Sequence, residues 1–209
     1  MLLSSLKQIL QKMGDNSSKK SMSRQERIDD LLERQRLLTG ALVAVRKPTV
    51  AALPGAAAGA GLAIALACDI RIAARSAFVS AGYARVGLSG DYGIAWLLSR
   101  TVGSPIAREM MFTSDRVDAD RAERIGLFNR VVADELLQEQ AFAMARALAH
   151  GPAVALRHMK DNLDEAASID FDTALQHEAH RLVDASRTDD HREAVRAFIE
   201  KRKPNFTGR

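Results

Sequence analysis

Hydrophobic residues in the first part of the chain follow the spacing of a helix and then of a buried strand. Apolar side chains recur every three or four positions over 24–46, which indicates a helix with one apolar face. Ser23 stands where an N-cap is expected, with Glu26 as the partner of a capping box. The helix ends before Pro48, because the residue before a proline avoids helical backbone angles. The short apolar run that follows predicts a strand over 49–53.

The rest of the chain alternates short apolar runs with longer helical patterns. Strands are predicted over 69–74, 77–80 and 128–132, and helices over 59–67, 92–102, 105–113, 119–125, 134–149, 152–167, 171–186 and 189–201. Strand–helix units therefore come first and helices alone come last, which is typical of an α/β fold with a helical C-terminal part. The pattern predicts few strands and many helices, and the first strands of a sheet are absent from it.

Three segments follow from this pattern. Residues 1–22 are predicted to be an irregular N-terminal segment, in which an amphipathic start gives way to a polar linker. Residues 23–133 are predicted to be the core of the fold, and residues 134–209 a helical C-terminal region.

The composition is that of a globular protein and excludes several classes. Of 209 residues, 47% are hydrophobic and 27% charged, and 30 Lys and Arg against 26 Asp and Glu leave a net charge of +4. This excess suits an anionic ligand without requiring nucleic acid, and two Tyr, one Trp and seven Phe supply a base-stacking surface poorly. No apolar run has the length of a membrane span, and the start of the chain lacks the layout of a signal peptide. We therefore expect a cytoplasmic protein.

Cys68 and the five His are weak candidates for chemistry. A lone cysteine builds neither a disulfide framework nor a zinc site, and the Ala and Leu around Cys68 predict buried packing. All five His lie in the predicted helical tail. His177 and His180 have the i, i+3 spacing of metal ligands, but no third ligand is indicated by spacing, so we expect no metal site.

The most unusual stretch of the sequence is 55–61, which consists of Gly and Ala alone. It is not a Rossmann fingerprint, because the motif that would begin at Gly59 lacks its last Gly, and it is not a P-loop, because no Lys follows. Two uses remain. A bare backbone lets a ligand come close to the free N–H groups at the start of a helix, which stabilise an oxyanion. Alternatively, the small residues serve only the tight packing of a helix on a strand.

Four stretches of the chain carry a specific set of motifs. They are KPTVAALPGAAAGAGLAIALACDIRIAARSAFV, VGLSGDYGIAWLLSRTVG, FTSDRVDADRAERIGLFNRVV and DDHREAVRAFIEKRKPNF. In this order they resemble the motifs of the crotonase superfamily, the enoyl-CoA hydratase/isomerase family, over residues 24–209. The resemblance implies a spiral of strand–helix units with a helical C-terminal part that forms trimers or hexamers. It also implies an acyl-CoA substrate, and no cofactor besides the CoA of that substrate.

The resemblance also implies how the stretch of Gly and Ala works. Family members hold the thioester carbonyl with two backbone N–H groups, which stabilise an enolate. One donor maps to Ala60, with Gly59 and Gly61 beside it to let the thioester come close. The F-x-A-G-x-D segment that supplies the other donor has no counterpart here, so the chain resembles a family member that is incomplete at its N-terminus. Gly87, in the segment that resembles G-L-x-P-x-x-G, is expected to contact substrate.

The same resemblance points to Asp91 as the acid–base residue. The two glutamates of family hydratases map to Ala63 and Tyr83, and neither is a general base at neutral pH. Asp91 falls where some isomerases of the family carry a carboxylate, and one carboxylate suits a proton shuttle that moves a double bond without adding water. The alternative is that Asp91 caps the helix predicted from Tyr92. Tyr83 either lines the pocket or packs in the core.

Further residues have two interpretations each. Lys201 matches a family lysine that reaches the phosphates of CoA, in some members across a subunit boundary, or else it is a solvated helix end. Phe198 is expected to pack in the core or in an interface. Arg71, Arg75 and Arg85 either attract an anionic ligand or, as we expect, are solvated.

The favoured function is therefore enoyl-CoA isomerisation through an enolate. The first alternative is a non-catalytic family member that binds acyl-CoA or joins other subunits, which Ala63, Tyr83 and the absent donor segment favour. The second is enoyl-CoA hydration, or RNA binding through the helix at 24–46, although that helix mixes basic and acidic residues. We expect a homo-trimer or homo-hexamer that binds neither membrane nor nucleic acid.

Overall fold

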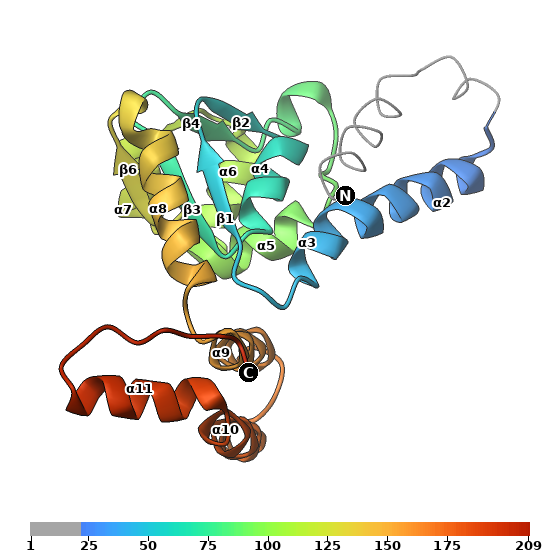
Figure 1. Cartoon of the computed structure of the whole chain (residues 1–209). Coiled ribbons are helices and arrows are strands. Elements are labelled where there is room, and N and C mark those ends of the chain that lie inside the picture. Colours follow the sequence, from blue (N-terminus) through green and yellow to red (C-terminus); the bar gives the residue numbers. More distant parts are fainter. Residues whose placement is uncertain (1–21) are drawn as a thin grey trace.

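The computed structural model describes residues 22–209, and two small three-stranded sheets form its centre (Figure 1). The first sheet has the order β1 (Val50–Leu53), β3 (Ile70–Ala74) and β6 (Arg130–Val132), all parallel. The second has the order β2 (Ala56–Ala58), β4 (Phe78–Ser80) and β5 (Val117–Asp118). In it, β2 is parallel and β5 antiparallel to β4. Only Pro54 and Gly55 separate β1 from β2, so the chain passes from one sheet to the other there.

Helices surround these sheets. The N-terminal helix consists of α2 (Arg24–Gln35), the π-helical η2 (Arg36–Gly40) and α3 (Ala41–Val43). The helices packed around the sheets are α4 (Ala60–Leu66), α5 (Ile94–Val102), α6 (Ser104–Thr113), α7 (Ala119–Arg124) and α8 (Leu137–Ala149). Two short 3₁₀ turns, η3 and η4, are Ala84–Val86 and Asp134–Leu136. The last helices are α9 (Ala153–Ala166), α10 (Phe171–Ser186) and α11 (Asp189–Ile199).

The predicted N-terminal helix is confirmed, with one feature that was not predicted. The Ser23 hydroxyl accepts the N–H of Glu26 (3.2 Å), whose carboxylate accepts the N–H of Ser23 (2.6 Å), so the capping box is present. Over η2 the backbone is π-helical, and the Thr39 hydroxyl donates to the Gln35 carbonyl (3.2 Å). Such a segment is too short to change the spacing of apolar residues noticeably, so the sequence pattern does not reveal it.

The sequence pattern also misses β2 and β5. β2 consists of three Ala and lacks the β-branched and aromatic residues that mark strands, while β5 has only two residues. α5 begins at Ile94 rather than at 92, because Tyr92 (φ 51°) and Gly93 (φ 74°) adopt left-handed angles. The N-terminal helix ends at Val43, three residues before its predicted end. The other predicted helices and strands lie within two residues of their predicted ends, with η4 counted as the first turn of α8.

The core lies between the two sheets and the helices that cover them. α8 packs on the first sheet, and α4 packs against β2 and α5 (Figure 1). The largest fully buried apolar side chains include Leu62, Ile72, Val79, Ile94, Leu98 and Phe128. Burying one such side chain stabilises a fold by about 1.5–3 kcal/mol relative to its exposure, so this cluster is the main support of the two short sheets.

Helices α9 to α11 form a separate layer below the core (Figure 1). The Lys160 ammonium of α9 lies 2.8 Å from Asp69 Oδ2, and the same oxygen accepts the N–H and the hydroxyl of Thr49 (2.7 Å each). Beside this pair, Arg46 Nε donates to Asp161 Oδ1 (3.0 Å). Asp69 and Thr49 directly precede β3 and β1, so α9 is fastened to the start of both strands.

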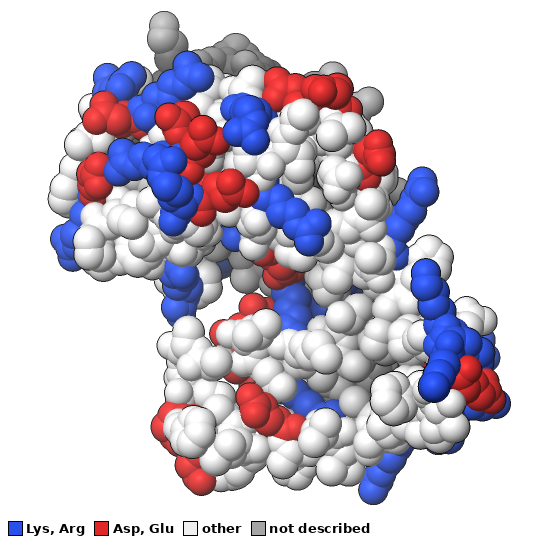
Figure 2. Space-filling model, turned by 90° about the vertical axis from the view of Figure 1, so that its left-hand side faces the viewer, with Lys and Arg blue, Asp and Glu red and all other residues white. Residues whose placement is uncertain are grey.

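The helical layer exposes much apolar surface. Its exposed large apolar side chains include Met159, Leu163, Phe171, Leu182, Phe198 and Ile199. Figure 2 shows charges of both signs interspersed over the core and wide uncharged areas over the lower layer on this face. Phe198 is 85% exposed, so the predicted packing in the core is wrong and packing in an interface is the interpretation that remains. Among the helices of residues 22–209, none combines the length and the apolar character that a membrane crossing needs.

Replacing Lys160 tests how much its ion pair with Asp69 stabilises the packing of the helical layer on the core. Lys160→Met keeps the apolar stem but removes the charge that Asp69 binds, and the Lys160 side chain is only 8% exposed. We expect a loss of about 1–3 kcal/mol in the free energy of unfolding, measured with urea. Arg75→Met is the matched control, because the Arg75–Asp120 pair is more than half exposed, and it should cost less than about 0.5 kcal/mol. Equal losses in the two variants would contradict this role of Lys160.

Candidate active site

The parallel pairing of β2 with β4 brings two loops to one edge of the second sheet. Ala58, the last residue of β2, is paired with Ser80, the last residue of β4. The segments that follow, 59–60 and 81–83, therefore leave the sheet side by side. Because ligands of α/β proteins bind at the carboxyl ends of parallel strands, this edge is where a site is expected.

The first of these segments is a turn that opens α4. Ala60 is the first residue of that helix, and the first N–H groups of a helix have no acceptor within it. Gly59 precedes it with φ 53° and ψ −122°, a combination that only Gly adopts without strain. The Gly59 N–H donates to the Ser80 carbonyl (3.1 Å), which ties the turn to β4. Gly59 is therefore required by the turn itself, whatever comes close to it.

The phenol of Tyr83 lies beside this turn. A Cβ atom on Gly59 would be 3.7 Å from both Cζ and the hydroxyl oxygen of Tyr83. Tyr83 is 7% exposed, and its hydroxyl donates to Asp91 Oδ1 (2.5 Å). Burial first, and then the Asp91 carboxylate, hold the pKa of Tyr83 well above its usual value, so the phenol stays protonated at neutral pH. The structure thus brings together Gly59, Ala60, Tyr83 and Asp91, which we call the Asp91 site.

Asp91 does not cap the helix that follows it. The N-cap of α5 is Gly93, and the Asp91 side chain turns instead to Tyr83. Tyr92 has a left-handed backbone (φ 51°), which is uncommon outside Gly, and its N–H donates to Gln35 Oε1 (2.7 Å). Gln35 is the last residue of α2, so the N-terminal helix holds the loop that carries Asp91. The capping alternative is wrong, because the carboxylate is bound elsewhere.

No pattern in the sequence points to Ser114, yet it supports the turn that carries Tyr83. Ser114 follows α6 with left-handed angles (φ 52°) and is fully buried. Its hydroxyl accepts the N–H of Ala84 (3.1 Å), and its carbonyl accepts the hydroxyl of Ser80 (2.7 Å). The end of β4 and the start of η3 are thereby both fixed to α6, with Tyr83 between them.

The other predicted site residues are Gly61, Gly87 and Lys201. Gly61 is the second residue of α4 and lines a groove of about 700 Å³ beside β1 and β2. Gly87 ends η3 with φ 69° and is exposed. Lys201 follows α11, which lies in the helical layer far from α4, so a single chain does not bring Lys201 to Asp91 (Figure 1).

Two expectations about Arg71 and Cys68 are corrected. Arg71 is 7% exposed rather than solvated, and it donates to the carbonyls of Leu127 and Cys68 (2.6 Å each). The bond to Leu127 ties β3 to the chain before β6, so Arg71 is structural. Cys68 is half-buried rather than fully packed, with its thiol 3.7 Å from the Ile64 carbonyl, and burial raises its pKa.

The remaining candidates are surface groups. Arg75 and Arg85 are solvated as predicted and form exposed ion pairs. His177 lies on the surface of the helical layer, 2.7 Å from Glu165. Within the part of the chain that the structure describes, no three His, Cys, Asp or Glu side chains gather in a way that could hold a metal ion.

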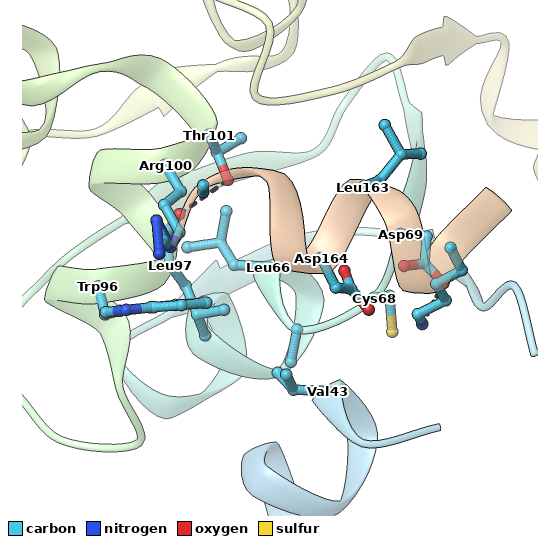
Figure 3. Close-up of a pocket in the computed structure, with 13 residues that line it drawn as sticks. Val43, Leu66, Cys68, Asp69, Trp96, Leu97, Arg100, Thr101, Leu163 and Asp164 are labelled. Atoms are coloured by element: carbon cyan, nitrogen blue, oxygen red, sulfur yellow. Dashed lines mark hydrogen bonds and ion pairs between the residues drawn. The ribbon is translucent and has the colours of Figure 1, made fainter. Parts of the chain in front are cut away.

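A second hollow lies where the core meets the helical layer (Figure 3). Its volume is about 330 Å³, and residues 66–69, α5 and α9 supply most of its lining. Arg100 lies 4.0 Å above the ring of Trp96, and Asp69 is paired with Lys160, so these charged groups already have partners. The lining contains no residue of the Asp91 site, so the two places are distinct.

Comparison with known proteins decides what family this fold represents. The family model described as enoyl-CoA hydratase/isomerase matches residues 9–209. The chain belongs to the enoyl-CoA hydratase/isomerase family. The predicted membership of the crotonase superfamily is thereby confirmed.

Among similar members of the enoyl-CoA hydratase/isomerase family, some are named as hydratases and others as isomerases. The short-chain-enoyl-CoA hydratase of Clostridium acetobutylicum is 37% identical over 159 residues, which are 76% of this chain and 61% of the relative. The 1,2-epoxyphenylacetyl-CoA isomerase of Escherichia coli is 39% identical over 168 residues, which are 80% of this chain and 64% of the relative. The chain thus spans less than two thirds of the length of either relative.

Solved structures of the family confirm the fold. An enoyl-CoA hydratase from Bacillus anthracis matches with a TM-score of 0.86 at 30% identity, over 93% of this chain and 75% of that one. One from Polaromonas sp. JS666 matches with a TM-score of 0.85 at 31% identity, over 95% and 76%. The α/β fold of the crotonase type, which the four motifs predict, is therefore the fold of this chain.

Alanine at Gly59 tests the turn at the centre of the site. Gly59→Ala forces an L-residue into angles that suit Gly alone, so we expect a loss of about 1–3 kcal/mol in unfolding free energy. Gly61→Ala is the control, because a Cβ there meets no atom within 4 Å and Ala favours a helix, so stability should be unchanged or rise by up to about 1 kcal/mol. Thermal unfolding measures both. A Gly59→Ala protein as stable as the Gly61→Ala protein would contradict the claim that this turn requires Gly.

Proposed function

We propose that the protein moves a double bond in an enoyl-CoA thioester, with Asp91 as the residue that carries the proton. The main support is the Asp91 carboxylate, which Tyr83 holds beside the turn at 59–60 in a member of the enoyl-CoA hydratase/isomerase family. The resemblance assigns the thioester oxygen to the N–H of Ala60. An acid–base group and an oxyanion donor would then lie at one edge of the second sheet.

The proposed reaction consists of two proton transfers. The Asp91 carboxylate takes a proton from C2 of a 3-enoyl-CoA, and the electron pair of that C–H bond passes into a dienolate whose oxygen accepts the N–H of Ala60. The carboxylic acid so formed returns the proton to C4, and the electrons close a double bond between C2 and C3. No water is added and no further cofactor is consumed, so one carboxylate is sufficient.

Two positions disfavour hydration as the main reaction. By resemblance, the glutamates of a hydratase correspond to Ala63 and Tyr83. Ala63 is fully buried and has no ionisable group, and the Tyr83 phenol is kept protonated. Adding water needs a base to activate it, and neither position supplies one. Since the names of relatives include hydratases and isomerases alike, the preference for isomerisation rests on these residues and on Asp91.

A non-catalytic protein that binds acyl-CoA is the second candidate. Ala63 and Tyr83 favour it as well, because an inactive chain would no longer need the two glutamates. Such a protein would bind the thioester through the same turn and leave it unchanged. The two candidates therefore differ in turnover and agree in binding.

We also propose that Lys201 of a neighbouring copy binds the CoA phosphates in a homo-trimer or homo-hexamer. Lys201 follows α11 in the helical layer, whereas Asp91 precedes α5 in the core, so we infer that a contribution to the same substrate comes from a second copy. The helical layer that carries Lys201 exposes Leu182 (72%) and Phe198 (85%), and exposed apolar surface of this kind is typical of protein interfaces.

Asp91→Asn tests the proposed reaction. The amide keeps the shape of the side chain but does not accept the proton, so we expect kcat for a 3-enoyl-CoA to fall by about 10²–10⁴-fold with KM nearly unchanged. The absorbance of the conjugated 2-enoyl product follows the reaction. Asp115→Asn is the control, because Asp115 is exposed in an ion pair with Arg85, and it should react at the wild-type rate.

The outcomes separate the candidates. Wild-type turnover in the Asp91→Asn variant would exclude the proposed role of Asp91. A folded wild-type protein that binds acyl-CoA without converting it would support the non-catalytic candidate instead. Formation of 3-hydroxyacyl-CoA from a 2-enoyl-CoA at a comparable rate would assign the protein to the hydratases.

Lys201→Gln tests the proposed phosphate contact. Loss of one charge-assisted contact should raise KM for acyl-CoA about tenfold with little change in kcat. An acyl-pantetheine substrate, which lacks the nucleotide phosphates, should be converted equally well by variant and wild type. Lys203→Gln, two residues further on, is the control and should keep the wild-type KM. Equal KM values for acyl-CoA in all three proteins would contradict the contact.

A further inference from the structure

We propose that Tyr83 is a positioning residue, whose hydroxyl binds Asp91 Oδ1 so that Oδ2 is left to transfer the proton. This inference rests on the proposed function of Asp91. It goes further by assigning which of the two carboxylate oxygens transfers the proton and which group holds the carboxylate in position.

The hydrogen bond joins a buried phenol to a half-buried carboxylate. The Tyr83 hydroxyl donates to Oδ1 over 2.5 Å, while Oδ2 accepts no hydrogen bond from the side chains of residues 22–209. Because Tyr83 is only 7% exposed, its phenol has little room to swing away. An Asp side chain turns easily about its last torsion, and a fixed donor on one oxygen removes this freedom.

The backbone on the other side of the carboxylate is held as well. The Tyr92 N–H donates to Gln35 Oε1 (2.7 Å), and the Asp91 carbonyl accepts the N–H of Ile94 (3.1 Å). The loop and the side chain are thus fixed by groups from α2, α5 and the turn after β4. Such double support keeps a reacting group within a fraction of an ångström of its working place.

Other charged groups near the site do not take over this task. Asp30 and Arg34 of α2 form an ion pair with each other (2.6 Å). Burial and the Asp91 carboxylate raise the pKa of the neighbouring Tyr92 phenol, on which Arg34 and Asp30 have opposite effects. The protonated Tyr83 phenol is the donor that binds the carboxylate directly. Its hydroxyl also lies beside the Gly59 turn, where a Cβ atom would be 3.7 Å from the hydroxyl oxygen. Oδ2 is the oxygen left to carry the proton from C2 to C4 of the substrate.

Tyr83→Phe removes the hydroxyl and keeps the ring. We expect kcat for a 3-enoyl-CoA to fall about 10- to 100-fold, because a carboxylate that rotates freely spends less time in the reactive position. KM should change less than about twofold, since the thioester contacts remain. A crystal structure of Tyr83→Phe should show Asp91 in a new or a second side-chain conformation.

A double-mutant cycle separates positioning from a purely structural role. If Tyr83 acts through Asp91, Tyr83→Phe should lower kcat less than about twofold in the Asp91→Asn background, measured at high enzyme concentration. If the role of Tyr83 is only structural, Tyr83→Phe should lower kcat by the same factor in the wild-type and Asp91→Asn backgrounds. It should also lower the melting temperature. An unchanged kcat in Tyr83→Phe, or one conformation of Asp91 identical to that of the wild type, would overturn the inference.

The cycle also distinguishes this inference from the proposed function. If Asp91→Asn is inactive and Tyr83→Phe is fully active, only the positioning role fails. If Asp91→Asn keeps wild-type turnover, the proposed function fails, and the positioning role is overturned with it.

Discussion

The register between β2 and β4 is the constraint on which the rest of the site depends. Both strands have three residues and end at the same level, because Ala58 is paired with Ser80. The turn at 59–60 and the turn that carries Tyr83 therefore emerge together. In a strand, a slip of one residue turns every side chain to the other face, so another register would separate the Gly59 turn from the Tyr83 phenol. The bare Ala side chains of β2 contribute little packing of their own, so α4 and the pairing with β4 hold the strand in place.

Each group of the site is held by an element distant in sequence. Ser114 at the end of α6 binds both sides of the turn that carries Tyr83. Gln35, just before the π-helical segment, binds the strained backbone at Tyr92. π-Helical segments recur at functional sites, and here the segment adjoins the residue that supports Asp91. The short sheets alone would not fix these loops, and the polar contacts between helices and loops do.

The sequence predicts a large part of this structure and less of its site. The long amphipathic helices, the capping box at Ser23 and the fold implied by four motifs are all confirmed, because each depends on local spacing or on several stretches at once. Asp91 and Tyr83 are both identified from the resemblance, but their hydrogen bond is not, since it depends on left-handed residues in the loop between them. Burial of Arg71 is missed because its partners are backbone carbonyls, which no side-chain pattern reveals.

A crystal structure with an unreactive acyl-CoA analogue tests most directly whether the edge of β2 and β4 is the active site. We expect the thioester oxygen about 3 Å from the Ala60 nitrogen, and the acyl C2 and C4 within reach of Asp91 Oδ2. The nucleotide end should then lie near Lys201 of a neighbouring copy. An acyl chain bound instead in the hollow between Trp96 and Leu163, with Asp91 remote from its carbon atoms, would contradict the proposed site and with it the role of Asp91.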